Sequence, residues 1–156
     1  MSEKRKILLK NLAKLCKTVA DARKILEKSY EETKNIDLDK YKTAEDLEWE
    51  TLKNIEMLCS RFSRLSDIYI QKLLRLIDEV ELIYEGSIID RLNRAEKREL
   101  IVSAEIFIEI RDLRNDISHE YLPEVLMEIF KDSIKYTPEL INACKKTVEY
   151  AEQLLK

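Results

Sequence analysis

Hydrophobic residues recur every three or four positions along nearly the whole chain. In the first run, over residues 3–34, the spaced positions are Leu8, Leu12, Leu15, Val19, Ala22, Leu26 and Tyr30. A turn of α-helix takes 3.6 residues, so these side chains gather on one face. The pattern predicts a long helix from about Glu3 to Lys34 with that face buried in a bundle.

The periodicity stops over residues 35–42, which predicts a connection, and then resumes as far as about residue 84. Thr43 suits the N-cap of this second helix because its hydroxyl can accept from a free N–H of the first turn. Glu45 and Asp46 follow it, where the helix dipole favours negative charge. Gly86, the only glycine, predicts a C-cap or a turn after the helix.

The second half of the chain predicts four further helical segments. These are a short helix over 87–92, a long helix over 95–117, a helix over 123–135 and a last helix that starts at residue 137. Thr137 suits an N-cap, and Pro138 suits the first helical position, where a missing N–H costs nothing. We therefore expect an all-α fold: one domain over residues 1–156, built as an up-and-down bundle of four to five helices.

The composition agrees with a folded helical domain and limits its environment. Hydrophobic residues make up 45% and charged residues 38%, with one glycine and two prolines, which argues against strands and disorder. The net charge of −3 gives no general attraction to nucleic acid, so any RNA site must be a local patch. Cys16, Cys59 and Cys144 have no metal-like spacing and predict reduced thiols. Without a membrane-length apolar run or a signal peptide, we expect a cytoplasmic protein with no cofactor, no metal and no membrane contact.

Polar chemistry concentrates between Arg111 and Tyr121, a stretch that includes His119, the only histidine. The buried stripe before it is Ile106, Ile110, Leu113 and Ile117. At about 100° per residue, Arg114 lies about 70° from that stripe, and His119 lies about 140° from Arg114 on an unbroken helix. Either the helix ends before His119 and the chain turns back, or His119 works with an arginine of another subunit. Pro123 favours an end here, because it disfavours helical geometry at the residue before it.

The spacing Arg114-Asn115-x-x-x-His119 resembles the signature of HEPN domains. With Tyr121 added, it is similar to the HepT toxin of HEPN/MNT toxin–antitoxin pairs. The run over residues 55–67 resembles the second helix of that family, although Cys59-Ser60 stands where the family often has glycine-glutamate. The resemblance implies a homodimeric ribonuclease toxin whose two motifs face one cleft. It also implies a nucleotidyltransferase antitoxin of the MNT type that attaches AMP to Tyr121.

The motif residues have the chemistry that metal-independent RNA cleavage needs. A histidine that titrates near neutral pH can take and give the protons as the 2′-hydroxyl attacks and the 5′-oxygen leaves. Arg114 can hold the phosphate and stabilise its developing charge, and Asn115 can donate to a phosphate oxygen. A lone histidine in a helical protein is more often structural, but the spacing to Arg114 and Tyr121 favours a functional His119.

A group of basic residues precedes the motif, and positions 91, 94 and 98 share a helical face. One interpretation is a solvated face; the other is a track of positive charge that leads RNA to the motif. The arginines predicted to contact RNA are Arg91, Arg94, Arg98 and Arg111.

Two rival functions remain open. One is a non-catalytic helical substrate-binding partner of a small nucleotidyltransferase, because fold alone does not settle function. The other is a structural, oligomerising bundle, which leaves the polar cluster unexplained.

Overall fold

The computed structural model describes residues 1–120 and 122–156, and these residues form helices and connecting segments without a strand. The long elements are α1 (Glu3–Thr33), α2 (Trp49–Asp67), the π-helical η3 (Ile68–Leu73), α3 (Leu74–Val80), α4 (Ile88–Lys97), α5 (Ala104–His119) and α6 (Pro123–Leu154). Two short 3-10 turns, η1 (Leu38–Lys40) and η2 (Ala44–Asp46), lie in the connection after α1. The predicted all-α class is confirmed.

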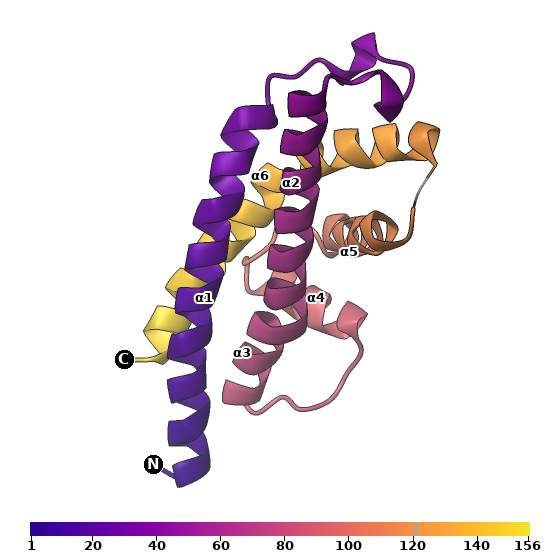
Figure 1. The fold of residues 1–156 in the computed structure, drawn as a ribbon. Helices are drawn as coiled ribbons and strands as arrows, with labels where there is room; N and C mark the ends of the chain where they lie inside the picture. The colour runs from indigo at the N-terminus through magenta and orange to yellow at the C-terminus, as the bar shows by residue number, and fades with distance from the viewer. Residues whose placement is uncertain (121) are drawn as a thin grey trace.

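The helices pack into a bundle around the continuous run of α2, η3 and α3 (Figure 1). α1 and the yellow C-terminal part of α6 contact one side of this run, and α5 contacts another side. α4 packs against α5 and α3, and α5 also contacts α6. The run of α2 therefore touches every layer, which makes it the scaffold that holds α5 in place.

The central part of the second predicted helix is helical, but both of its predicted ends are wrong. Thr43 caps the short turn η2 through a capping box with Asp46, so the α-helix itself begins only at Trp49. The run ends at Val80, and Leu82, with φ of 67°, takes the left-handed conformation after it. Gly86, with φ of 115°, instead sits just before the N-cap of α4.

The helix predicted over 95–117 is wrong, because a turn separates α4 from α5. α4 runs on to Lys97, and Glu99 then adopts a left-handed φ of 62°. Ser103 caps α5, its hydroxyl accepting from the N–H of Ile106 at 3.3 Å. Leu100 and Ile101 lie in this turn and are buried, so their apolar spacing matched that of a helix.

The helix boundary predicted at Thr137 is also wrong, because α6 is continuous through Pro138. The Thr137 hydroxyl donates to the carbonyl of Ser133 at 2.6 Å, inside the helix rather than at a cap. Pro138 lacks an N–H and crowds the preceding turn, which bends a helix without having to end it. In Figure 1, α6 changes direction between its orange and yellow parts.

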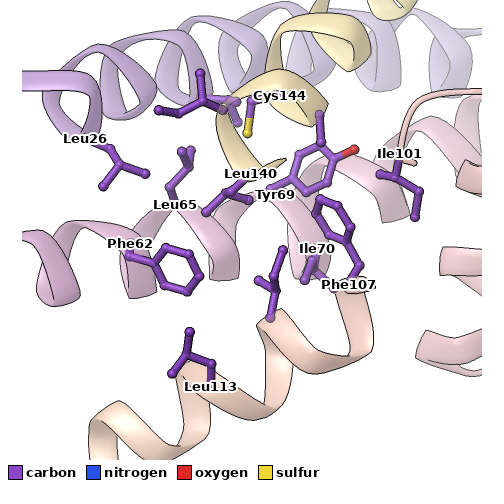
Figure 2. Packing of buried hydrophobic residues seen from close by; sticks show 14 of the residues in the cluster. Leu26, Phe62, Leu65, Tyr69, Ile70, Ile101, Phe107, Leu113, Leu140 and Cys144 are labelled. Atoms are coloured by element: carbon purple, nitrogen blue, oxygen red, sulfur yellow. The ribbon is translucent and has the colours of Figure 1, made fainter. Parts of the chain in front are cut away.

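The core brings α2, η3, α5 and α6 together (Figure 2). Phe62 and Tyr69 meet the aromatic and aliphatic side chains of α5, and the rings of Tyr69 and Phe107 lie 5.8 Å apart between centroids. The buried Tyr69 hydroxyl shares a 2.7 Å hydrogen bond with Thr147. Cys16, Cys59 and Cys144 are buried free thiols, as predicted, and burial raises the pKa of each.

A buried ion-pair network joins α3 to α4. The side chain of Asp78 is only 3% exposed, and Arg94 and Arg98 donate to its two carboxylate oxygens at 2.7 and 2.8 Å. Arg98 also donates to Glu81 at 2.8 Å. A buried carboxylate is tolerated only with such compensation, because its desolvation is costly.

We predict that Asp78→Ala lowers the free energy of unfolding by about 3–5 kcal/mol, because it leaves the partly buried guanidinium of Arg94 without its partner and Arg98 with Glu81 alone. Urea unfolding followed by circular dichroism measures this. Glu79→Ala is the matched control: its pair with Arg75 is on the surface, and its loss costs below about 1 kcal/mol. Equal losses in the two variants would contradict the structural role of Asp78.

Candidate functional site at the end of α5

The C-terminal half of α5 carries the candidate residues and is anchored by its buried face. Ile110 and Leu113 are buried, and Ile106 and Ile117 pack against the core, which confirms the predicted stripe. The helix continues through His119, and the N–H of Glu120 donates to the carbonyl of Asp116 at 2.9 Å. A helix that ends before His119 is therefore excluded. Residues 114 and 119 lie about 140° apart around the axis and about 7.5 Å apart along it.

Arg114 is held by a bidentate ion pair with Asp67, the last residue of α2. Its Nε and Nη2 donate to the two carboxylate oxygens of Asp67 at 2.6 and 2.8 Å, and its Nη1 donates to Ser118 Oγ at 2.6 Å. The hydrogen bond and the charge of Asp67 raise the pKa of Arg114. The guanidinium uses three of its five N–H donors in these contacts, and the other two have no hydrogen-bond partner within the described residues. The Arg114 side chain is 29% exposed, so a phosphate can reach it.

Asp67 is a member of the candidate site that sequence reasoning did not single out. It lies where α2 passes into the π-helical η3, and such π segments are often found at functional sites. Ser66 and Tyr69 on either side of it are buried, whereas Asp67 is half-buried and turns toward α5. A charged residue between buried positions was the only signal, and it does not identify a partner 47 residues away.

The structure does not bring His119 and Asn115 together with Arg114 in one chain. Both side chains are exposed, and neither forms a side-chain hydrogen bond within the described residues. They lie one helical turn apart, and by the same spacing His119 shares its face with Asp112 and Asp116. The imidazole is therefore open to solvent on an acidic face.

The arginines predicted to contact RNA make contacts inside the protein. Arg94 and Arg98 bind Asp78, and Arg91 donates to the carbonyl of Ile70 at 3.2 Å. Burial lowers the pKa of Arg91. Arg111 is half-buried, one turn before Arg114 on α5. An RNA contact by these four residues stays a prediction, and the internal contacts of Arg91, Arg94 and Arg98 explain their positions without it.

A cavity of about 470 Å³ lies beside Arg114, between α2, α5 and the start of α6. Its lining residues are Glu56, Cys59, Ser60, Ser63, Ile117, Ser118, Glu120, Leu126, Ile129 and Phe130. Ser118 connects the cavity to the guanidinium of Arg114. Burial raises the pKa of Cys59 to about 11, so its thiol is protonated and unreactive near neutral pH. Tyr121, the predicted AMP acceptor, lies outside the described residues.

Comparisons with known proteins identify no relative: no family model, curated protein or solved structure matches the chain. Within residues 1–120 and 122–156, no group of three or more His, Cys, Asp or Glu side chains is placed to hold a metal ion. None of the helices in the same residues combines the length and apolarity needed to cross a membrane.

We predict that Asp67→Ala frees the Arg114 side chain while leaving the fold intact. The Asp67 side chain is 43% exposed, so the loss of the pair costs at most about 1 kcal/mol of stability. The Nε–H of Arg114, hydrogen-bonded in the native protein, becomes exposed to solvent and exchanges faster. Nuclear magnetic resonance of the arginine Nε–H signals measures the change. Asp21→Ala, which breaks an exposed pair with Lys17, is the control; an unaltered Arg114 signal in Asp67→Ala disproves the contact.

Proposed function

We propose that this chain is a ribonuclease toxin of the HEPN type, in which Arg114 of one subunit and His119 of a second act on the same RNA phosphate. The observation that carries the proposal is the continuity of α5 through His119. Because the two side chains leave one helix in directions about 140° apart, a single copy does not present both to one phosphate. A two-fold axis pairs each arginine with the histidine of the other copy.

Arg114 is suited to hold the phosphate because its guanidinium is already oriented. Asp67 binds the edge of the guanidinium formed by Nε and Nη2, and Ser118 binds Nη1. An oriented cation loses little conformational freedom when it binds an anion, so it favours the more highly charged transition state. In this arrangement Asp67 acts as a positioning residue and does not touch the RNA.

His119 supplies the proton transfers in the proposed reaction. The 2′-oxygen bonds to phosphorus and loses its proton to a base, while the bond from phosphorus to the 5′-oxygen breaks and that oxygen takes up a proton. An exposed imidazole is accessible to both oxygens, and its two ring nitrogens can accept and donate protons. Asn115, one turn earlier on α5, donates a hydrogen bond to a phosphate oxygen.

The proposal includes a nucleotidyltransferase antitoxin that neutralises the enzyme by attaching AMP to Tyr121. An adenylate two residues from His119 adds a phosphodiester anion and a bulky base beside the motif. The anion attracts an arginine of the site, and the bulk excludes the RNA.

A second candidate function is a non-catalytic partner of a small nucleotidyltransferase. The bidentate pair of Arg114 with Asp67 favours it, because a guanidinium neutralised within the chain can serve structure alone. The two candidates differ in whether loss of His119 or Arg114 abolishes RNA cleavage.

We predict that Arg114→Ala and His119→Ala each abolish RNA cleavage, and that mixing the two inactive proteins restores part of it. A mixed dimer contains one site with both residues and one with neither, so it has about half the activity of the native dimer. Cleavage of a labelled RNA, with and without a chelator, measures the effect, and we expect the chelator to have none.

Arg75→Ala is the control, since it removes an exposed arginine far from α5 in the sequence and leaves cleavage unchanged. Circular dichroism checks that all variants fold. If mixing restores nothing, the two residues act within one subunit or not at all; if His119→Ala still cleaves RNA, the catalytic role of His119 is refuted.

We predict that co-expression with a cognate nucleotidyltransferase adds one or more AMP masses to the peptide that contains Tyr121 and abolishes RNA cleavage. Tyr121→Phe stays folded and escapes the modification because it lacks the acceptor hydroxyl. Mass spectrometry of the co-expressed protein measures it. An unmodified Tyr121 peptide in fully neutralised protein means that the antitoxin acts by binding alone.

A further inference from the structure

The cavity beside Arg114 has the size and walls of a small-molecule site. Its volume of about 470 Å³ falls within the range of about 300–1,000 Å³ typical of such sites. Four apolar side chains form much of the wall: Ile117, Leu126, Ile129 and Phe130. Phe130 adds an aromatic surface of the kind against which nucleic-acid bases pack.

The polar groups of the cavity select the charge of what enters it. Glu56 lines the cavity from α2 and forms no ion pair or side-chain hydrogen bond within the described residues. Glu120 lines it from the end of α5 and accepts from the N–H of Leu122 at 2.9 Å. The lining identified above contains no basic side chain. An anionic group is repelled from it, and a neutral group with N–H donors is favoured.

A second polar group in the cavity lacks a partner. The Ser63 hydroxyl is buried and forms no hydrogen bond within the part of the chain that the structure describes. A buried hydroxyl without a partner is unfavourable, so a ligand that pairs with it gains affinity. Ser63 follows Glu56 by seven residues on α2, about two helical turns, so both lie on one face of the helix.

Arg114 is placed to bind the phosphate of the same ligand at the rim. Its Nη1 donates to Ser118 Oγ, and Ser118 lines the cavity. A nucleotide can therefore rest its phosphate on the guanidinium outside and insert its base into the apolar interior. Arg114 is not itself a lining residue and is adjacent to the cavity through Ser118, whereas Glu56 is an exposed lining residue. The guanidinium and the carboxylate match the two ends of a nucleotide, the anionic phosphate and the donor-bearing base.

We infer that this cavity is a base pocket that selects guanine next to the phosphate held by Arg114. The inference rests on the proposed ribonuclease function, because it assigns Arg114 to the same RNA. Guanine alone among the four RNA bases presents two adjacent N–H donors, at N1 and N2, to a single carboxylate. Glu56 accepts both, and the Ser63 hydroxyl donates to an acceptor of the purine. Adenine and cytosine place a ring acceptor beside their amino group, which a carboxylate repels, and uracil flanks its one N–H with carbonyls.

Binding of free nucleosides to the full chain tests the pocket without any cleavage step. In calorimetric titrations, we expect guanosine to bind at least about tenfold more tightly than adenosine, cytidine or uridine, the difference that a charge-assisted pair of hydrogen bonds supplies. Glu56→Gln removes the charge but keeps the shape, and it should weaken guanosine binding about tenfold. Glu50→Gln, on the same helix and paired with Lys53, is the matched control and should leave the affinity unchanged.

A second pair of measurements separates the contribution of the phosphate to binding from that of the base. Arg114→Ala should weaken the binding of guanosine 3′-monophosphate and leave the binding of guanosine unchanged, because the nucleoside has no phosphate. Equal affinity for the four nucleosides, or guanosine binding unchanged in Glu56→Gln, overturns the guanine pocket. If the native protein cleaves RNA yet shows either result, only the pocket is refuted. If guanosine binds selectively but no RNA is cleaved, the pocket stands and the ribonuclease proposal falls.

Discussion

The rotation of about 100° per residue along an α-helix sets what α5 can present to a ligand. Its buried stripe, anchored by Ile110 and Leu113, fixes the rotation of the whole element against α2 and α6. Once that stripe is in the core, Arg114 must face α2 and the cavity, and His119 must face away from both. The helix cannot relieve this separation by ending early, because it runs through His119. Any joint action of the two residues on one phosphate therefore depends on a second copy of the chain.

The ion pairs between α3 and α4 and between α2 and α5 show how burial changes what a carboxylate does. Asp78 is almost fully buried and forms ion pairs with two arginines at once, so its charge is compensated only in the folded protein. Asp67 is partly open to water and binds one arginine. In the second case the solvent screens the pair, which lowers its contribution to stability but lets the cation respond to an incoming anion. The same residue types thus form a buried network between α3 and α4 and a partly exposed pair between α2 and α5.

The sequence pattern predicted correctly the elements in which the apolar spacing and the capping residues indicate the same helix ends. It failed where a buried residue lies in an irregular segment. The first helix ends within a residue of its predicted limit, and α4 begins one residue after the predicted start at Ser87, although it runs five residues past the predicted end. Leu100 and Ile101 are buried although they belong to a turn, so the apolar pattern continued across the turn and predicted one helix where there are two. Pro138 predicts a helix start because proline favours the first turn, yet it lies inside the continuous helix α6. The motif residues were found from spacing alone, but the pairing of Arg114 with Asp67 depends on tertiary contact and on the π-helical segment, which leave little trace in the pattern.

The charges around the motif give the proposed two-fold arrangement an electrostatic reason. A groove of about 400 Å³ between α5 and α6 is lined by Glu109, Asp112, Asp116, Glu128 and Asp132 among others, and two of these acids share the face of His119. Burial and the neighbouring acids raise the pKa of Asp132, as expected where negative charges crowd. Such a face repels an RNA phosphate from a lone His119. Under the proposed function, a guanidinium brought to this face by a second subunit would supply the missing positive charge, so that His119 would act only where the partner's arginine holds the phosphate. On that proposal, the acidic face would restrict cleavage to the assembled dimer.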